Sequence, residues 1–179
     1  TTLIPSKLEL LADWPPEQLW FEGDATNLER LGSYRFQDPA GEVGMEGLLI
    51  TAGGEAVYHV PLTYRAEPLA GAEAFLVGTS EHGVLGTRWI YSAMGDPVYR
   101  AVLATTIAHG GAEAPEEVMQ ADGSTVARET FTHLRGSGSQ GHAVPGFVTA
   151  EITDEDGLTY AFSGGATLAI KRVATRDGH

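Results

Sequence analysis

The sequence predicts an α+β fold, with a curved, mainly antiparallel β-sheet of about 7–8 strands, one longer helix over about residues 96–109 and short N-terminal helices. Two observations predict this class. Apolar residues alternate with period two from residue 33 to residue 65, and strand-like runs return in the last third of the chain. The one extended helical pattern lies between these groups, which favours a helix that covers one face of an antiparallel sheet.

The chain length predicts a single domain over residues 1–179. A chain of 179 residues, 42% of them hydrophobic, is long enough for one well-buried core and too short for two ordinary domains. The formal net charge of −13 would repel phosphate backbones and anionic lipids. We therefore expect neither nucleic acid nor a membrane surface as a partner.

Cysteine usage and the N-terminal sequence predict a cytoplasmic location. The chain contains no cysteine, which excludes disulfides, thiol nucleophiles and thiolate zinc sites and fits a reducing compartment. No apolar run approaches the roughly 18 residues that span a bilayer, and the first ten residues, TTLIPSKLEL, lack a signal-peptide pattern.

Short helices are predicted at the N-terminus. Residues 6–9, SKLE, fit a capping box, in which the side chains of Ser6 and Glu9 satisfy the first free amides of a helix. Pro15 predicts a break after this helix, and Pro16 can begin another short helical turn.

Residues 33–65 predict a three-stranded antiparallel meander. Strands over 33–37, 43–49 and 56–65 are separated by the turns 38–41 and 52–55. The third strand, AVYHVPLTYR, has Ala56, Tyr58, Val60, Leu62 and Tyr64 on its core face, and Val57, His59, Pro61, Thr63 and Arg65 on the other. Pro61 cannot donate a ladder hydrogen bond, so we expect it at a sheet edge or a bulge, with the second face open to a ligand or partner.

The middle of the chain predicts a long excursion, a strand and the longer helix. Residues 66–86 show little regular pattern beyond one or two short extended pieces, whereas 86–92 read as a strand. Asp96-Pro97 is a helix start, with the carboxylate as cap, and Gly110-Gly111 ends the helix. A helical turn is expected over 116–120.

The last third of the chain is predicted to be strand and turn. The loop at 135–146 is expected to be mobile because it holds four glycines and two serines. The predicted strands cover 124–134, 147–153, 158–164 and 166–173, with a turn at 154–157.

Catalytic signatures are mostly negative. The sequence has no phosphate-binding loop, dinucleotide-binding fingerprint or nucleophile elbow in the required context, so we expect no cofactor. The six histidines have no metal-ligand spacing, and the turn at 154–157 lacks the ligand pattern of a calcium loop, so no metal site is expected. Glu81-His82, in a glycine-rich stretch, is the best acid/base candidate.

Several motifs in the first two thirds of the chain carry a family resemblance. Trp14 and Trp20-Phe21 are followed by VPLTYR at 60–65, by EHGVLGTRW at 81–89 and by Asp96-Pro97. In this order they resemble the N-terminal cap domain of actinobacterial maltokinases, and more closely the stand-alone maltokinase cap-like proteins. The resemblance covers roughly residues 5–110 and implies a single cap-like domain.

This resemblance implies a function without catalysis. In full-length maltokinases the phosphate-transferring residues belong to a downstream kinase domain, and the cap packs against its nucleotide-binding lobe. Because the chain ends at His179 without such a domain, we expect a non-catalytic binding or regulatory module. Its expected partner is a sugar kinase or another enzyme of trehalose, maltose or α-glucan metabolism, or a small carbohydrate.

Seven residues are candidates for contact with a ligand or partner: His59, Thr63, Arg65, Glu81, His82, Arg88 and Trp89. An alternative class is a small hydrolase or isomerase with a pocket on the concave face of the sheet, which would use His59, Arg65 or the Glu81-His82 pair. That alternative requires His59 to converge with Glu81 or His82 within hydrogen-bond reach. A third alternative is a structural protein that self-associates through a sheet edge.

Overall fold

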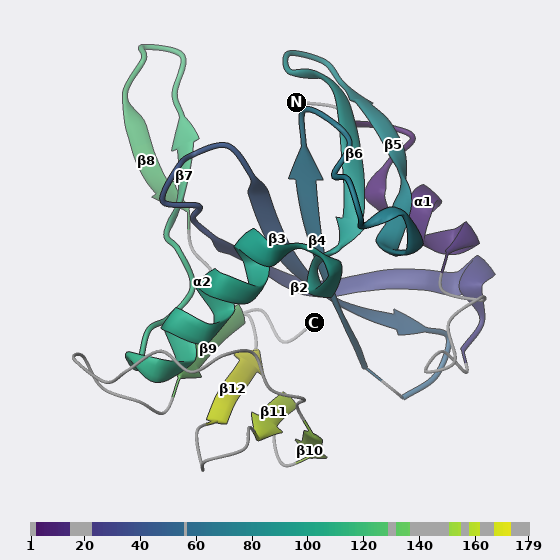
Figure 1. Cartoon of the computed structure of the whole chain (residues 1–179), viewed down its shortest axis with the longest axis vertical. Helices are drawn as coiled ribbons and strands as arrows, with labels where there is room; N and C mark the ends of the chain where they lie inside the picture. The colour runs from purple at the N-terminus through teal and green to yellow at the C-terminus, as the bar shows by residue number, and fades with distance from the viewer. Residues whose placement is uncertain are drawn as a thin grey trace. The chain divides into compact units, whose positions relative to one another are not determined.

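The computed structural model describes residues 3–14, 23–55, 57–128, 132–136, 151–154, 158–161 and 167–172 (Figure 1). The chain divides into two compact units. The first comprises Thr1–Ser33 with Gln37–Arg100, and the second comprises Tyr34–Phe36 with Ala101–His179. Each unit is described by itself below, and the expected single domain stays a prediction.

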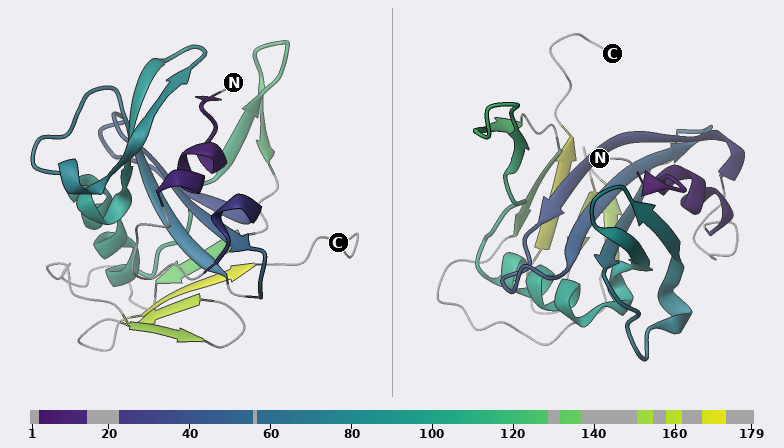
Figure 2. Two further views of the ribbon diagram at one scale, coloured as in Figure 1. Left: turned by 90° about the vertical axis from the view of Figure 1, so that its right-hand side faces the viewer. Right: turned by 90° about the horizontal axis from the view of Figure 1, so that it is seen from above.

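The largest sheet has six strands and lies mainly in the first unit. Its order is β1-β5-β6-β4-β3-β2, and the pairs with a described register are antiparallel. The strands are β1 (Leu3–Ile4), β2 (Leu28–Phe36), β3 (Gly44–Ala52), β4 (Tyr58–Arg65), β5 (Leu76–His82) and β6 (Gly86–Ser92). They twist and curl (Figure 2), and the predicted α+β class with a curved antiparallel sheet is confirmed.

Strand β4 lies inside this sheet, between β3 and β6, so the expectation that Pro61 marks an edge strand was wrong for the strand as a whole. Locally, however, the pairing explains the proline. Pro61 is opposite Gly47 of β3, while the register with β6 runs only from Leu62 to Arg65. A residue without an N–H donor is therefore tolerated at the point where the β6 ladder ends.

The region between β4 and β6 is more regular than expected. Residues 66–86 were predicted as an excursion with short extended pieces, but they contain the seven-residue strand β5. Its glycine and polar residues hid the strand, which forms through pairing with β6.

The N-terminal helix α1 (Lys7–Asp13) confirms the predicted capping box. The Ser6 hydroxyl accepts from the Glu9 amide at 3.3 Å, and the Glu9 carboxylate accepts from the Ser6 amide at 2.6 Å. Leu11 of this helix joins the buried core formed with Leu48, Ile50, Val60, Leu62 and Ile90. The second helical turn predicted after Pro16 lies outside the described residues.

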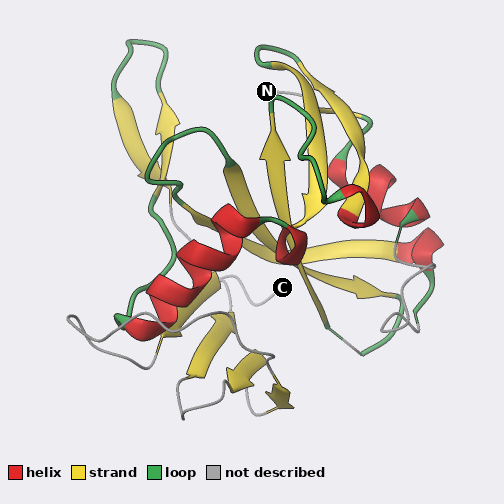
Figure 3. Cartoon of the chain, viewed as in Figure 1, coloured by secondary structure: helices red, strands yellow, loops and turns green. Residues whose placement is uncertain are grey.

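The longer helix α2 (Pro97–Ala108) confirms the predicted helix start (Figure 3). The Asp96 carboxylate caps it by accepting from the Val98 amide at 2.9 Å. Three short 3₁₀ helices complete the helical structure of the described part: η2 (Ala25–Asn27), η3 (Glu73–Phe75) and η4 (Ala93–Gly95).

Two further sheets lie in the second unit. Strands β7 (Glu116–Met119) and β8 (Thr125–Arg128) form a hairpin. A four-stranded sheet has the order β10-β11-β12-β9, with β9 (Thr132–Gly136), β10 (Glu151–Asp154), β11 (Leu158–Ala161) and β12 (Thr167–Arg172).

Two predictions in this region were wrong. The helical turn expected over 116–120 is strand β7, because Val118 pairs with Val126 of β8 across the hairpin. The single strand expected over 124–134 is divided between β8 and β9, which belong to different sheets. The loop predicted at 135–146 begins within β9, and its residues 137–146 lie outside the described part.

Candidate functional site

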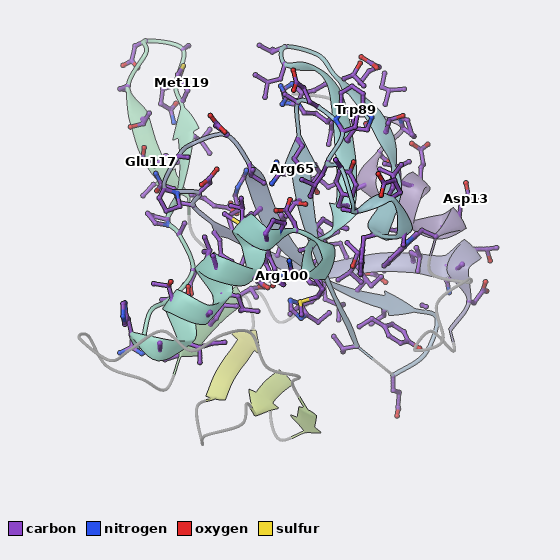
Figure 4. All side chains as sticks on the ribbon, viewed as in Figure 1. Asp13, Arg65, Trp89, Arg100, Glu117 and Met119 are labelled. Atoms are coloured by element: carbon purple, nitrogen blue, oxygen red, sulfur yellow. The ribbon has the colours of Figure 1, made fainter. Side chains whose placement is uncertain are left out.

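The pairing of β4, β5 and β6 determines where the seven candidate residues lie. Arg65 of β4 is directly opposite Trp89 of β6, and Thr79 of β5 is opposite Trp89 on the other side. Arg65 and Trp89 are labelled in Figure 4. Thr63 is two positions before Arg65 and therefore shares its face. The structure thus brings Thr63, Arg65 and Trp89 to one region of the sheet.

The central interaction of this region joins Arg65 to Asp96. The Nε atom of Arg65 donates to Oδ2 of Asp96 at 2.7 Å, and Nη2 donates to Oδ1 at 2.9 Å. The Asp96 side chain is 0% exposed and that of Arg65 is 20% exposed. The bidentate geometry and the burial make this a structural ion pair between β4 and the first turn of α2.

The electrostatic balance keeps both groups charged. Burial acts to raise the pKa of Asp96, but hydrogen bonds from Arg65 and Val98 outweigh it and hold the pKa below its ordinary value of 3.8. The same hydrogen bond with Asp96 raises the pKa of Arg65. A ligand that displaced Arg65 would have to compensate the desolvation cost of the buried Asp96 carboxylate.

A second buried carboxylate, Asp38, lies near this pair and adds to the attraction on Arg65. It accepts from the amides of Ala40, Glu42 and Val43 at 2.9 to 3.0 Å. Burial opposes its ionisation, but these amides and the charge of Arg65 lower its pKa. The carboxylate therefore organises the turn between β2 and β3.

The candidate positions on the second face of β4 differ in exposure. Thr63 is fully buried. Burial also lowers the pKa of the half-buried His59 to about 4, so its imidazole is neutral near pH 7. Alternation predicts which residues share this face but not how far each is exposed, and Val57 on the same face is 40% exposed.

The remaining candidates hold the β5–β6 turn. The Nδ1 atom of His82 accepts from the amides of Val84 at 3.2 Å and Leu85 at 2.9 Å. The Arg88 guanidinium donates to the Leu85 carbonyl at 2.7 Å. Glu81 accepts from the hydroxyl of Thr87, its cross-strand partner, at 2.6 Å. These side chains stabilise a hairpin turn.

The sheet register separates His59 from Glu81-His82. Glu81 is opposite Thr87, two positions beyond Trp89, which is opposite Arg65. His59 is six positions from Arg65 in the other direction along β4. At roughly 3.3 Å per residue the two groups are about 25 Å apart along the strands. The convergence that the alternative enzyme hypothesis requires is not formed in the described sheet.

A charged cluster that the sequence reasoning missed lies on the core face. Glu46 of β3 is buried and accepts hydrogen bonds from the Lys7 ammonium and, at 2.9 Å, from the Tyr64 hydroxyl. The Lys7 ammonium also lies 5.5 Å from the centroid of the Tyr64 ring. A signal was present, because strand alternation puts Glu46 on the same face as the core residues Leu48 and Ile50, where a carboxylate requires a partner.

A comparable contact lies in the described part of the second unit. The Glu113 carboxylate lies 2.7 Å from Nδ1 of His133 and accepts from the Leu134 amide at 2.9 Å. Burial acts to raise the pKa of Glu113, but these contacts lower it. The contact fixes the segment before β7 to strand β9.

The described ranges offer neither a metal centre nor a membrane-spanning helix. No group of three or more His, Cys, Asp or Glu side chains there is arranged to hold a metal ion. Among the helices of the described part, none has the length and apolar character needed to cross a membrane.

The fold and site define the class of protein as an α+β domain in which a curved antiparallel sheet is tied to a helix start by a buried ion pair. The family of maltokinase N-terminal cap domains matches residues 14–96. Over this segment the chain is therefore similar to the cap domain, which confirms the predicted resemblance. No curated protein matches the chain. Both Arg65 and Asp96 lie inside the matched segment.

Proposed function

We propose that the chain is a non-catalytic binding or regulatory module related to the maltokinase cap. Its partner in this proposal is a sugar kinase domain or another enzyme of α-glucan, trehalose or maltose metabolism. The observation that carries the proposal is the match of residues 14–96 to the maltokinase N-terminal cap domain. The proposal implies a cytoplasmic location, where a partner kinase has access to ATP.

The contacts within the matched segment support a scaffold role. Arg65 binds Asp96, His82 accepts from two amides of its own turn, and Thr63 is buried. These groups stabilise the sheet and helix start that present the surface. Recognition would then depend on exposed side chains held by this rigid frame.

Calorimetry can test the proposal directly. The full chain is titrated into a purified maltokinase kinase domain prepared without its own cap, and separately with maltose, trehalose and ATP. We expect saturable binding of the kinase domain with one chain per domain. An unrelated protein of similar acidity to this chain, whose pI is about 4.7, controls for non-specific charge attraction.

The outcomes separate the partner classes. Binding of maltose or trehalose without the kinase domain would make the chain a carbohydrate-binding module. If the kinase domain gives no saturable signal at either 50 or 150 mM salt, two conditions chosen because screening differs between them, the proposed partner is wrong.

A further inference from the structure

The hairpin β7–β8 has the features of an unoccupied interaction surface. It forms a separate two-stranded sheet (Figure 1), and within the described residues neither of its outer edges is paired with a further strand. Residues 117–127 are all exposed. A two-stranded ribbon in water is marginally stable on its own, so it gains stability when another surface covers it.

Large apolar side chains are exposed on both faces of this hairpin. Val118 and Val126 are cross-strand partners on one face and are 46% and 50% exposed. Met119, on the opposite face, is 74% exposed (Figure 4). Because the two valines adjoin across the hairpin, they form a small continuous apolar surface that a partner could cover.

The charge around these residues is mainly negative. Residues 112–128 contain four carboxylates and one basic residue, Arg128, which is the cross-strand partner of Glu116. Glu113 is engaged by His133 and the Leu134 amide, so Glu117 and Asp122 are the carboxylates offered to a partner. At the tip, Asp122 accepts from the hydroxyl and the amide of Ser124, which lowers its pKa and keeps it ionised. The net charge of −13 also disfavours a second copy of the chain as the occupant.

We propose that β7–β8 is the docking element for a partner protein surface that has an apolar centre and a rim of lysine or arginine side chains. This proposal rests on the proposed function for the identity of the partner, which is the kinase domain. The apolar surface with a basic rim is therefore expected on that kinase domain. The hairpin lies outside the segment that matches the cap domain. The valine pair supplies the apolar contact, and the carboxylates supply charge complementarity.

Paired substitutions test the apolar contact. The double variant Val118→Ser with Val126→Ser, and the single variant Met119→Ser, are compared with a control that carries Val84→Ser and Leu85→Ser. The control residues are also strongly exposed, but they lie in the β5–β6 turn. We expect the kinase domain to bind the valine variant at least tenfold more weakly, and the control within twofold of the wild type.

A charge reversal tests the complementarity. Glu117→Lys should weaken binding by about tenfold, whereas Glu67→Lys, an exposed position outside the hairpin, changes the net charge equally and should have little effect. Raising the salt concentration should weaken binding of the wild type more than that of Glu117→Lys. Circular dichroism and thermal melting establish that each variant is folded.

The outcomes distinguish the two proposals. If the wild type does not bind the kinase domain, the proposed function is wrong and the docking inference is withdrawn with it. If the wild type binds and the valine and charge variants bind equally well, the hairpin is not the docking element, although the proposed function stands. Self-association that disappears in the valine variant would make a second copy the occupant and would overturn the inference.

Discussion

The Arg65–Asp96 pair gives the sharpest test of how this domain is held together. Asp96→Ala removes both hydrogen bonds to the guanidinium and the cap of α2. Breaking a buried ion pair by removing one partner costs about 3–5 kcal/mol, and loss of a helix cap costs about 1 kcal/mol. Because the Arg65 side chain is 20% exposed and can be partly solvated, we expect a total of about 3–4 kcal/mol.

Urea unfolding at pH 7, followed by tryptophan fluorescence, measures this loss. A reduction of about 3 kcal/mol corresponds to a decrease in Tm of roughly 6–12 °C for a protein of this size. Asp96→Asn keeps an acceptor for the Val98 amide but removes the charge, so it should cost less than Asp96→Ala. Arg65→Lys keeps the charge but loses the two-pronged geometry.

A double-mutant cycle separates the pair from the other effects of substitution. The double variant Arg65→Met with Asp96→Ala should be less destabilised than the sum of the single variants by about 2 kcal/mol, because each single variant leaves an unpaired charge and the double variant leaves none. A loss below about 1 kcal/mol in Asp96→Ala would refute the reasoning, since that is the contribution of a solvent-exposed pair.

The pH dependence gives an independent check of the same pair. The folded-state pKa of Asp96 lies below its ordinary value of 3.8, so the unfolded chain binds this proton first on acidification. The stabilisation is therefore present above pH 3.8 and is lost as the pH falls through the folded-state pKa. The difference in stability between wild type and Asp96→Asn should decrease in that range.

The remaining predictions concern packing, the half-buried His59 and the core carboxylate Glu46. A Cβ on Gly136 would overlap the Thr106 carbonyl oxygen and lie 2.7 Å from Cα of Ile107. Gly136→Ala should therefore reduce the free energy of unfolding in urea by about 3 kcal/mol. An unchanged free energy of unfolding would contradict this close backbone contact. Burial lowers the pKa of His59 to about 4, so only the unfolded chain takes up this proton between pH 6.5 and pH 5. The free energy of unfolding of the wild type should therefore fall by about 1–2 kcal/mol over this range through His59. His59→Asn should lack this contribution, which urea unfolding at the two pH values measures. Glu46→Gln removes the charge that Glu46 offers to Lys7 and should reduce the free energy of unfolding by about 1–3 kcal/mol at pH 7. An unchanged urea midpoint would show that solvent screens this ion pair.

Features that depend on neighbouring residues could be predicted from the sequence. The capping box of Ser6 and Glu9 and the cap at Asp96 join groups two or three positions apart, so the local sequence contains both partners. The faces of β4 followed from alternation for the same reason. Pairing across the sheet was harder, because the β3–β4–β6 order that explains Pro61 depends on which strands meet in space.

Features that depend on distant partners could not be predicted in this way. Glu46 could be recognised as a carboxylate on an apolar face, but its partner Lys7 is 39 positions away in the sequence. Strand β7 was mistaken for a helical turn because its two glutamates favour helices locally, and its strand conformation depends on pairing with β8.

The prediction that the second β4 face is open to a ligand depends most on distant residues. Arg65 and Asp96 are 31 positions apart, and each belongs to one of the motifs that carry the cap resemblance. The contact between them explains why the two motifs occur together. One motif supplies a guanidinium on β4, and the other supplies the carboxylate that binds it at the start of α2. Arg65 and Asp96 bind one another in a buried pair. Their positions in the motifs are therefore explained by folding and give little information about a ligand. Residues that recognise a partner are therefore better sought among exposed side chains, such as those of β7–β8, than within the motifs themselves.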